Sequence, residues 1–475
     1  MAQTSPVISN LETIHIDDLP KLIVGADTLV PTLSGDMRYI NFDNAASTPT
    51  FAPINDAVAA FMRWYSNVHR GTGFKSQLSS WAFEESRDIV ADFIGADLSK
   101  QVVIFTKNST DALNKLARRL PLHKDDIVLT TYMEHHSNEL PWRRVGTVAH
   151  IGLNPDGTIS REDFHRKLDK FRGRVKLVAL TGASNVTGYI NDLCYFAHEA
   201  HRAGARILID GAQLVPHRPV DMKPSDPECA IDYLVFSAHK MYAPFGVGVL
   251  VADRKTFEDS EPDTVGGGVV DIVTLEEAYW SDLPEKEEAG TPDIIGVVAL
   301  AKAIRLFQSL GWENIIDHEA DLTAYALAEL GRIPGVTLYG ATDPSTARDR
   351  LGVVSFNVGD IPHALTAAIL SYEGAIGVRS GCFCAHTYVK MLLRVDDDAE
   401  MRLRSQILSR DRSEIPGAVR ASFGLYNTRD EIDRLTAMVK RIAAGDYHQD
   451  YILNKEKGEY TPHNFQLDFR QYFHL

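Results

Sequence analysis

A lysine between two apolar runs is the first residue of this chain whose setting points to chemistry. The stretch 233–251 reads YLVFSAHKMYAPFGVGVLV. This pattern predicts a strand, a tight turn at 243–246 and a second strand, with Lys240 at the rim of the first strand. Such a lysine either lays its stem along apolar neighbours with its amine in water, or presents its amine for a reaction. Because burial disfavours the charged form, a buried amine is a nucleophile toward carbonyl groups, as in Schiff-base lysines.

Polar residues stand where other predicted strands end. Helical patterns alternate with short apolar runs at 102–105, 127–130, 177–180 and 205–209. This alternation indicates a mainly parallel sheet in an α/β protein. In such sheets the chemistry is found at the carboxyl ends of the strands. Ser109, Asn185, Asp210 and Lys240 all follow predicted strands, so they are expected along one edge of the sheet.

Three of these strand ends suit a flat, phosphorylated ligand. Ser109 and Thr110 open a predicted helix, where hydroxyls and free N–H groups suit a phosphate, although the same residues cap ordinary helices. Asp210 ends a buried strand and needs a partner, which is either a protonated pyridine nitrogen or a nearby amide or arginine. A Schiff-base lysine paired with such an aspartate is the usual arrangement in enzymes that use pyridoxal phosphate (PLP). His135 could stack on a flat cofactor or form hydrogen bonds within its own loop.

A thiol and a guanidinium stand far along the chain. Cys384 lies in a polar loop with Arg379 and His386, which as cations would lower the pKa of the thiol. The alternative is that Cys382 and Cys384 are small buried apolar residues. Arg420, in the sequence AVRAS, could grip a substrate carboxylate or form a structural ion pair.

Composition limits the class of protein. The chain has 475 residues, 44% of them hydrophobic, which suggests two or three domains with ample core. A formal net charge of -15 argues against non-specific binding to nucleic acid and for a soluble particle. No apolar run is long enough to span a bilayer, and the first residues do not form a signal segment. We expect a cytoplasmic enzyme with neither a nucleic-acid nor a membrane partner.

The cysteines indicate a reducing compartment. There are four, at Cys194, Cys229, Cys382 and Cys384. So few in so long a chain form no disulfide framework. The C-x-C pair has neither a second cysteine pair nor a His-x-x-x-His nearby, so no structural zinc site is expected.

The pattern of elements divides the chain into four parts. We predict an N-terminal arm at 1–45 that joins the small domain, a large domain at 46–296, a small α+β domain at 297–446 and a tail at 447–475. A charged insert at 396–412 interrupts the small domain. The tail, rich in Tyr, Phe, His and Gln, could pack on the body, pack on a partner subunit or fray.

Eight short segments carry a resemblance to a known family. They lie at 67–71, 108–112, 134–138, 184–186, 210–213, 237–240, 289–292 and 420–422. In this order they resemble class V aminotransferase-fold PLP enzymes, and within these the SUF-type cysteine desulfurase and selenocysteine lyase group. The resemblance covers about 39–442 and implies a fold type I PLP-dependent homodimer. That fold is α/β, with a large, mainly parallel seven-stranded sheet domain and a smaller α+β domain.

The resemblance implies how the cofactor would be held. Lys240 would bind PLP, Asp210 would pair with its pyridinium nitrogen, and His135 would stack on the ring. Gln213 would reach the phenolic oxygen. The other implied cofactor-binding residues are Asn185 and, at the phosphate, Ser109, Thr110, Ser237 and His239. Thr291 would reach the phosphate held by the partner subunit, so that the active site is shared across the dimer.

The resemblance also implies a reaction. Asn185, Arg379 and Arg420 would hold the carboxylate of L-cysteine or a related amino acid. Cys384 would take the sulfur as a persulfide, releasing L-alanine, and pass the sulfur to an acceptor protein. Other PLP chemistry on the same scaffold (selenocysteine lyase, C–S lyase, amino-acid epimerase or aminotransferase) would not need Cys384. A non-catalytic sulfur-relay protein would bind no PLP at Lys240. In the resembled family Gly-His-His commonly precedes the nucleophilic cysteine, whereas here Gly-Cys-Phe precedes Cys384. The additional cysteine, Cys382, is either a resolving thiol or a packing residue.

Overall fold

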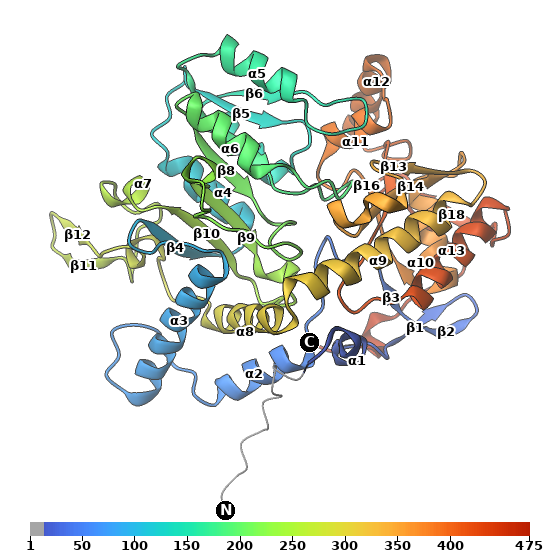
Figure 1. The fold of residues 1–475 in the computed structure, drawn as a ribbon. Coiled ribbons are helices and arrows are strands. Elements are labelled where there is room, and N and C mark those ends of the chain that lie inside the picture. The colour runs from blue at the N-terminus through green and yellow to red at the C-terminus, as the bar shows by residue number, and fades with distance from the viewer. Residues whose placement is uncertain (1–13) are drawn as a thin grey trace, which may run out of the picture.

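A seven-stranded sheet organises the larger part of the molecule (Figure 1). The structure is a computed structural model and describes residues 14–475, so the first part of the predicted arm lies outside the described residues. In spatial order the strands are β4 (Gln101–Thr106), β10 (Gly248–Asp253), β9 (Tyr233–Ser237), β8 (Arg206–Asp210), β7 (Val175–Thr181), β5 (Ile127–Thr131) and β6 (Thr147–Ile151). Only β10 runs antiparallel to its neighbours, so the predicted mainly parallel sheet is confirmed.

Alternating side chains give this sheet a hydrophobic core on each face. In β4, Val102 and Ile104 join one core, and Val103 and Phe105 join the other. Successive strand residues point to opposite faces, so a sheet covered on both sides needs apolar residues at nearly every position. The first core is covered by α4 (Ser109–Arg119). The second is covered by α2 (Ala52–Met62), α3 (Phe74–Phe93), α5 (Arg161–Lys170), α6 (Leu193–Arg202) and α8 (Ile294–Leu310).

A second, antiparallel sheet lies beside the first. Its order is β13 (Val336–Tyr339), β14 (Val353–Val358), β17 (Ala418–Ser422) and β16 (Arg379–Gly381). It shares a core with α9 (Trp312–Gly331), α10 (His363–Gly374) and α13 (Arg429–Ala443). From the N-terminal part, β3 (Ile40–Asn41) pairs in parallel with β15 (Ile376–Gly377). Because the two sheets have separate hydrophobic cores, we propose that the chain divides as the sequence predicts, into a large domain, a small domain and a joining arm.

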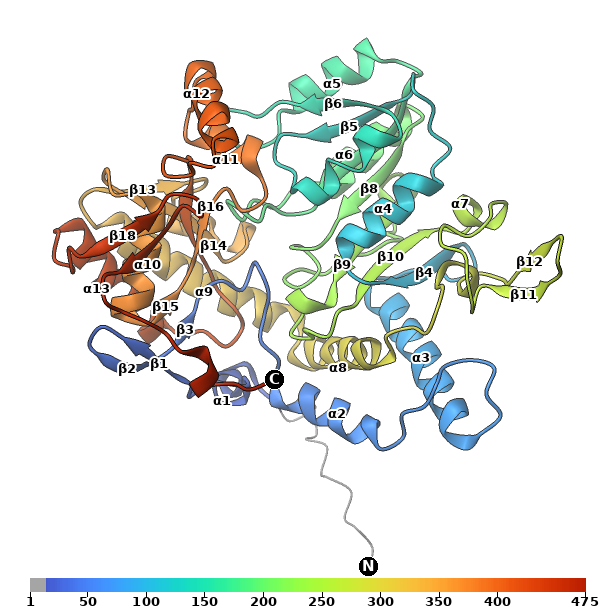
Figure 2. The ribbon, with the colours of Figure 1, turned by 180° about the vertical axis from the view of Figure 1, so that it is seen from behind.

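The remaining elements are other helices and three hairpins. They are α1 (Leu19–Leu22), α7 (Lys255–Glu258), α11 (His386–Leu392), α12 (Asp397–Leu408) and the hairpins β1–β2 (Leu29–Thr32, Gly35–Arg38), β11–β12 (Val270–Val273, Ala278–Trp280) and β18–β19 (Tyr451–Asn454, Glu459–Pro462). Of these helices, α1, α7 and α11 each add buried residues to a core. The charged insert forms α12, which protrudes beside α11 (Figure 2). The tail folds as β18–β19 against α10 and reaches the insert, where Arg412 N–H donates to the carbonyl of Lys455 over 2.8 Å.

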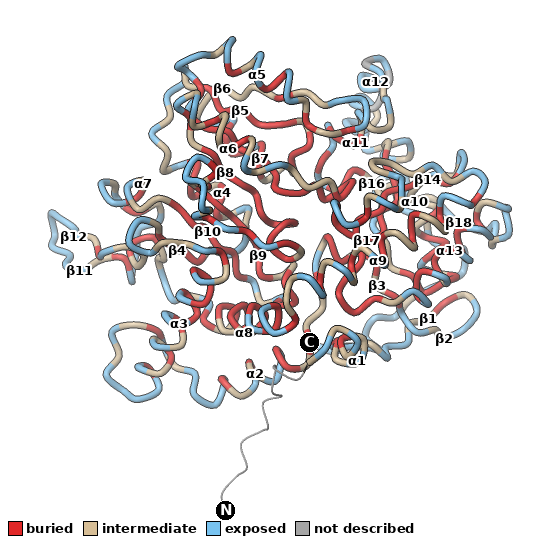
Figure 3. The backbone as a smooth tube through the Cα atoms, viewed as in Figure 1, coloured by how far each residue is buried: buried red, intermediate tan, exposed pale blue. Residues whose placement is uncertain are grey.

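Burial is concentrated in the strands of the two sheets and in α8 (Figure 3). Among residues 14–475, no single helix is long and apolar enough to cross a membrane. α8 and α9 meet that test of length and composition only as a pair, bent by 84°. Most apolar residues of α8 are packed in the second core of the large sheet.

The cysteines depart from the sequence prediction at one place. Cys194 on α6 and Cys229 form a disulfide, with their Cα atoms 4.3 Å apart. The two residues are 35 positions apart, and their proximity results from the packing of α6 against the turn that precedes β9. The sequence predicts a reducing compartment and no disulfide framework; this single bond is a pairing that it did not predict, while Cys382 and Cys384 are free thiols.

Candidate active site

A cavity of about 460 Å³ opens where the carboxyl ends of the large sheet meet the second sheet. The large sheet contributes residues that follow β4, β5, β7, β8 and β9, and the second sheet contributes β16, β17 and the loop after β16. Of the predicted site residues, all but Thr291 line this cavity: Ser109, Thr110, His135, Asn185, Asp210, Gln213, Ser237, His239, Lys240, Arg379, Cys384 and Arg420. The parallel topology brings residues from 109 to 240 to one place, and the packing of the second, antiparallel sheet adds Arg379, Cys384 and Arg420.

Lys240 ends a short 3-10 helix, Ala238–Lys240, directly after the buried strand β9. Within residues 14–475, its amine makes no hydrogen bond or ion pair. Burial, opposed by the charge of Asp210 and reinforced by that of Arg420, lowers the pKa of Lys240 to about 8. A substantial fraction of the amine is therefore neutral near physiological pH, and the neutral form is the nucleophile.

Hydroxyl groups gather at the N-terminus of α4. The backbone N–H of Ser109 donates to Ser237 Oγ over 2.8 Å, and Ser237 Oγ lies 3.0 Å from Ser109 Oγ. Thr110 Oγ1 and Ser137 Oγ are 2.7 Å apart. Strand β10 passes close beneath this turn, since a Cβ at Gly248 would lie 2.3 Å from the Asn108 backbone. The first turn of α4 therefore presents hydroxyls and a positive dipole end to the cavity, an arrangement suited to an anion.

His135 is held as a neutral imidazole. The N–H of Ser137 donates to His135 Nδ1 over 3.1 Å, so the proton of the neutral ring is on Nε2. Burial, with Lys240, His136 and Arg420 as nearby positive charges, lowers the pKa of His135 to about 4. Burial likewise lowers the pKa of His239 to about 4, so both rings face the cavity uncharged at neutral pH.

Asp210 lies at the end of β8 with few partners. It accepts one hydrogen bond, from the N–H of Ala212 over 3.0 Å, and burial raises its pKa. Gln213, one turn on, donates to the carbonyl of Ala45 over 2.6 Å, which ties it to the segment after β3. A buried carboxylate with so little compensation is costly unless a cation or N–H group approaches it from the cavity.

The second sheet supplies a buried arginine. Arg420 Nη2 donates to Asp43 over 2.8 Å and Nη1 to the carbonyl of Asn185 over 3.0 Å, while its Nε has no hydrogen-bond partner within the described chain. Burial lowers the pKa of Arg420, although the carboxylate of Asp43 opposes this. Arg379 is exposed and lies 3.7 Å from Asp43. The two guanidiniums place positive charge at one end of the cavity.

Cys384 lines the cavity from the loop after β16 of the second sheet, whereas Lys240 lines it from the large sheet. It is exposed and free. Cys382 is also free but buried, its Sγ donates to the carbonyl of Pro416 over 2.9 Å, and burial raises its pKa to about 11. The accessible thiol at the cavity is therefore that of Cys384.

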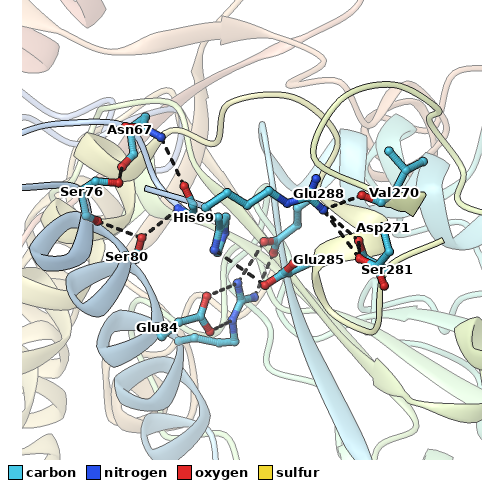
Figure 4. A network of polar contacts seen from close by, with 12 residues as sticks. Asn67, His69, Ser76, Ser80, Glu84, Val270, Asp271, Ser281, Glu285 and Glu288 are labelled. Atoms are coloured by element: carbon cyan, nitrogen blue, oxygen red, sulfur yellow. Dashed lines mark hydrogen bonds and ion pairs between the residues drawn. The ribbon is translucent and has the colours of Figure 1, made fainter. Parts of the chain in front are cut away.

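Thr291 is the one predicted residue that the fold does not bring to this cavity. It lines a separate hollow of about 290 Å³ beside the loop 67–71 and the segment 267–268. In that region Arg70 donates to the carbonyl of Val270 over 2.5 Å, and Arg87 pairs with Glu288 over 2.9 Å (Figure 4).

Four residues at the site were missed by the sequence reasoning or given no role there. Ser137 stands in a segment that carries the resemblance, so its hydroxyl could have been found. Glu134, in the same segment, accepts hydrogen bonds from Thr131, Asn138 and the N–H of Thr181, and burial raises its pKa to about 8. Asp43 accepts a hydrogen bond from Arg420, and the carbonyl of Phe383 accepts one from Asn185. Each pair is far apart in the sequence, so only the fold reveals it.

Comparison with known proteins places this site in a family. The model of the family described as aminotransferase class-V matches residues 40–435. The chain is 36% identical over 420 residues to a probable cysteine desulfurase of Halalkalibacterium halodurans, covering 86% of this chain and 94% of the relative. It is 35% identical over 425 residues to a cysteine desulfurase of Escherichia coli, covering 87% and 96%.

Solved structures agree with the sequence relatives. The apo structure of a cysteine desulfurase from Thermococcus onnurineus superposes with a TM-score of 0.75 at 32% identity, covering 90% of this chain and 98% of that one. The predicted resemblance is thereby confirmed. The chain belongs to the aminotransferase class-V family, and its relatives within that family are cysteine desulfurases.

Proposed function

We propose that this protein is a PLP-dependent cysteine desulfurase that converts L-cysteine to L-alanine and takes the sulfur on Cys384. The observation that carries the proposal is that a lysine with a lowered pKa and an accessible free thiol line one cavity. The relatives named cysteine desulfurases support the choice of reaction. A protein sulfur acceptor would then remove the sulfur from Cys384.

The residues of the cavity fit PLP. A flat phosphorylated aldehyde needs an amine, an anion site and a partner for its ring nitrogen. Lys240 offers the amine, and the first turn of α4 with Ser237 and His239 offers the anion site. Asp210 offers a buried carboxylate that accepts one hydrogen bond from the described chain, from the N–H of Ala212. His135 would lie on the ring face, and Gln213 near the phenolic oxygen.

The positive end of the cavity fits the carboxylate of an amino acid. Arg420 has a buried Nε without a hydrogen-bond partner among residues 14–475, and Asn185 and Arg379 line the same end. A guanidinium and an amide together favour a planar carboxylate. Asp43 would hold Arg420 in place, because the two are joined over 2.8 Å.

Lys240 and Cys384 would have separate roles in the reaction. PLP, when bound, supplies an electron-withdrawing ring that lets the α-proton of a bound amino acid leave. Lys240 Nζ, in its neutral form, would take up that proton. In the net reaction the Cβ–S bond of L-cysteine breaks and an S–S bond to Cys384 forms. The hydrogen of the Cys384 thiol ends on the alanine methyl group, so atoms balance without an oxidant or reductant.

A second copy of the chain would complete the site. Thr291 lies away from the cavity of its own chain, in a hollow that opens beside the hairpin β11–β12. Four large apolar side chains of that hairpin and its turn are exposed, namely Ile272, Val273, Leu275 and Tyr279. An exposed apolar cluster of this kind marks an interaction surface. These features support the predicted homodimer with Thr291 reaching the partner's phosphate.

The predicted cytoplasmic location remains part of the proposal. Persulfide chemistry requires Cys384 as a free thiol, which a reducing compartment maintains. The disulfide between Cys194 and Cys229 is a feature that such a compartment would disfavour.

Selenocysteine is the alternative substrate that the same cavity residues support, since it presents the same amino-acid carboxylate.

Product analysis tests the proposed function. Purified protein supplied with PLP should develop a near-visible absorbance band, and addition of L-cysteine should release alanine in equal amount to the sulfur recovered as sulfide and persulfide. L-serine, which lacks the sulfur, is the matched control and should release no alanine. A protein that binds PLP but forms no alanine from L-cysteine would contradict the desulfurase reaction, and one that binds no PLP would contradict the cofactor.

A further inference from the structure

The loop that carries Cys384 is held in an unfavourable backbone conformation. Phe383 has φ 51° and Cys384 has φ 55°, both in the left-handed region that side chains with a Cβ rarely adopt. Two such residues in succession cost free energy and persist only where the surroundings impose them. Contacts outside the loop must therefore hold Cys384 in this position.

The contacts that hold the loop come from the large domain. Asn185 Nδ2 donates to the carbonyl of Phe383 over 2.8 Å, and the N–H of His136 donates to the carbonyl of Cys384 over 2.8 Å. On the other side of the thiol, His386 packs parallel to His136, with ring centroids 4.7 Å apart and planes 3° apart. The two carbonyls that flank the strained positions are thus both tied to the far wall of the cavity.

The histidine pair has a defined donor and acceptor. His136 Nε2 lies 3.3 Å from the backbone N–H of His386 and 2.9 Å from His386 Nδ1. Because a backbone N–H can only donate, Nε2 of His136 must be the acceptor, and the proton between the two rings is on His386 Nδ1. We name this pair, His136 and His386, the histidine clasp.

We propose that the histidine clasp is a positioning device that fastens the Cys384 loop to the cavity wall and that opens when His136 is protonated. The proposal gives a role to His136 and His386 beyond the proposed desulfurase function, and rests on that function only for what Cys384 does. Protonation of Nε2 turns the shared acceptor into a donor, so both contacts with His386 are lost together. The loop can then relax from its strained conformation and move the thiol.

The clasp is closed at neutral pH. Burial and the neighbouring imidazole lower the pKa of His136, and burial and the charge of Lys390 lower the pKa of His386. His386 is therefore neutral there, rather than the cation that the sequence analysis expected beside the thiol. His136 binds a proton less readily in the closed clasp than in the open one. The closed clasp therefore weakens as the pH falls below about 6.5, the ordinary pKa of an imidazole. The other charged or titratable groups that face the two rings are Glu139, Arg143, His135 and Cys384.

Two substitutions at His386 separate positioning from other roles. His386→Ala removes the ring donor, whereas His386→Asn keeps an amide N–H near the position of Nδ1 but cannot titrate. The neighbouring Thr387→Ala, at an exposed position of the same helix, is the control. All variants are made in a Cys382→Ser background so that Cys384 is the reporting thiol, and thermal unfolding by circular dichroism verifies that each is folded.

The readout is the alkylation rate of Cys384 by iodoacetamide in protein without added cofactor, which does not depend on catalysis. At about pH 7.5 the rate for His386→Ala should differ from that of the parent by at least about threefold, because the loop moves the thiol once one ordinary hydrogen bond is lost. His386→Asn and Thr387→Ala should stay near the parent. The ratio of His386→Ala to parent should approach one near pH 5.5, because the parental clasp opens as well. A ratio near one at every pH, or an asparagine variant as fast as the alanine variant, would overturn the proposal.

Discussion

Lys240→Ala is expected to lose the near-visible band of bound PLP and to lower the rate of alanine formation by roughly four orders of magnitude or more. Effects of that size follow when a group that bonds covalently to the reacting species is deleted. Lys240 is the one amine that lines the cavity within the described chain. The measurements are the absorbance spectrum after PLP addition and the initial rate of alanine release from L-cysteine.

A second lysine provides the control for this prediction. Lys302 on α8 is also partly buried with a lowered pKa, yet lies outside the cavity, so Lys302→Ala should keep both the band and the rate. The wild-type protein freed of cofactor should capture PLP faster as the pH rises through about 8, since the pKa of Lys240 is about 8 and the neutral amine reacts. A Lys240→Ala protein that retains the PLP band would show that another group holds the cofactor.

Cys384→Ala is expected to keep the PLP band and to lose the formation of persulfide and alanine by at least about a hundredfold. The thiol is the acceptor of the sulfur, so its removal leaves the cofactor residues intact but the Cβ–S bond without a nucleophile. Stopped assays of alanine and of protein-bound sulfur, run with the same enzyme preparation, measure the two products.

Cys382→Ala is the matched control, two residues away in the same loop. Cys382 is buried, with its Sγ directed to the carbonyl of Pro416 and a pKa raised to about 11. It is mostly a thiol at physiological pH and a poor nucleophile. Its replacement should change the rate of alanine formation by less than about threefold. A Cys384→Ala protein that still releases sulfide from L-cysteine at the wild-type rate would instead favour PLP chemistry that does not need Cys384, such as that of a C–S lyase.

Much of the site could be predicted because short-range patterns determine it. Lys240, Asp210 and Ser109 each follow an apolar run that forms a strand of the large sheet, and the alternation of strands and helices predicts that their carboxyl ends meet. Nine of the predicted residues line the cavity for this reason, whereas Arg379, Cys384 and Arg420 reach it from the second, antiparallel sheet. The strand order and the antiparallel direction of β10 were not readable from the pattern, because register depends on pairing between distant segments.

The contacts between distant segments explain what the sequence left open. Asp43 and Arg420 are 377 residues apart, and the carbonyl of Phe383 meets Asn185 across 198 residues. Neither Asp43 nor a carbonyl oxygen has a local pattern that marks it as a site group. The disulfide between Cys194 and Cys229 was missed for the same reason, since 35 residues separate the two and composition argued for free thiols. His386 was expected to be a cation, whereas its burial and the charge of Lys390 in the fold lower its pKa, so that it is neutral.

The central claim is that Lys240 and Cys384 act on one molecule of L-cysteine in one cavity. The most direct measurement is peptide mass spectrometry of the PLP-loaded protein after a brief reaction with L-cysteine in the absence of any acceptor, with free thiols and persulfides trapped by alkylation. We predict one added sulfur atom on the peptide that contains Cys384, none in the Lys240→Ala protein, and alanine released in equal amount. Added sulfur on Cys382 instead, or alanine released with no sulfur on either cysteine, would contradict this account.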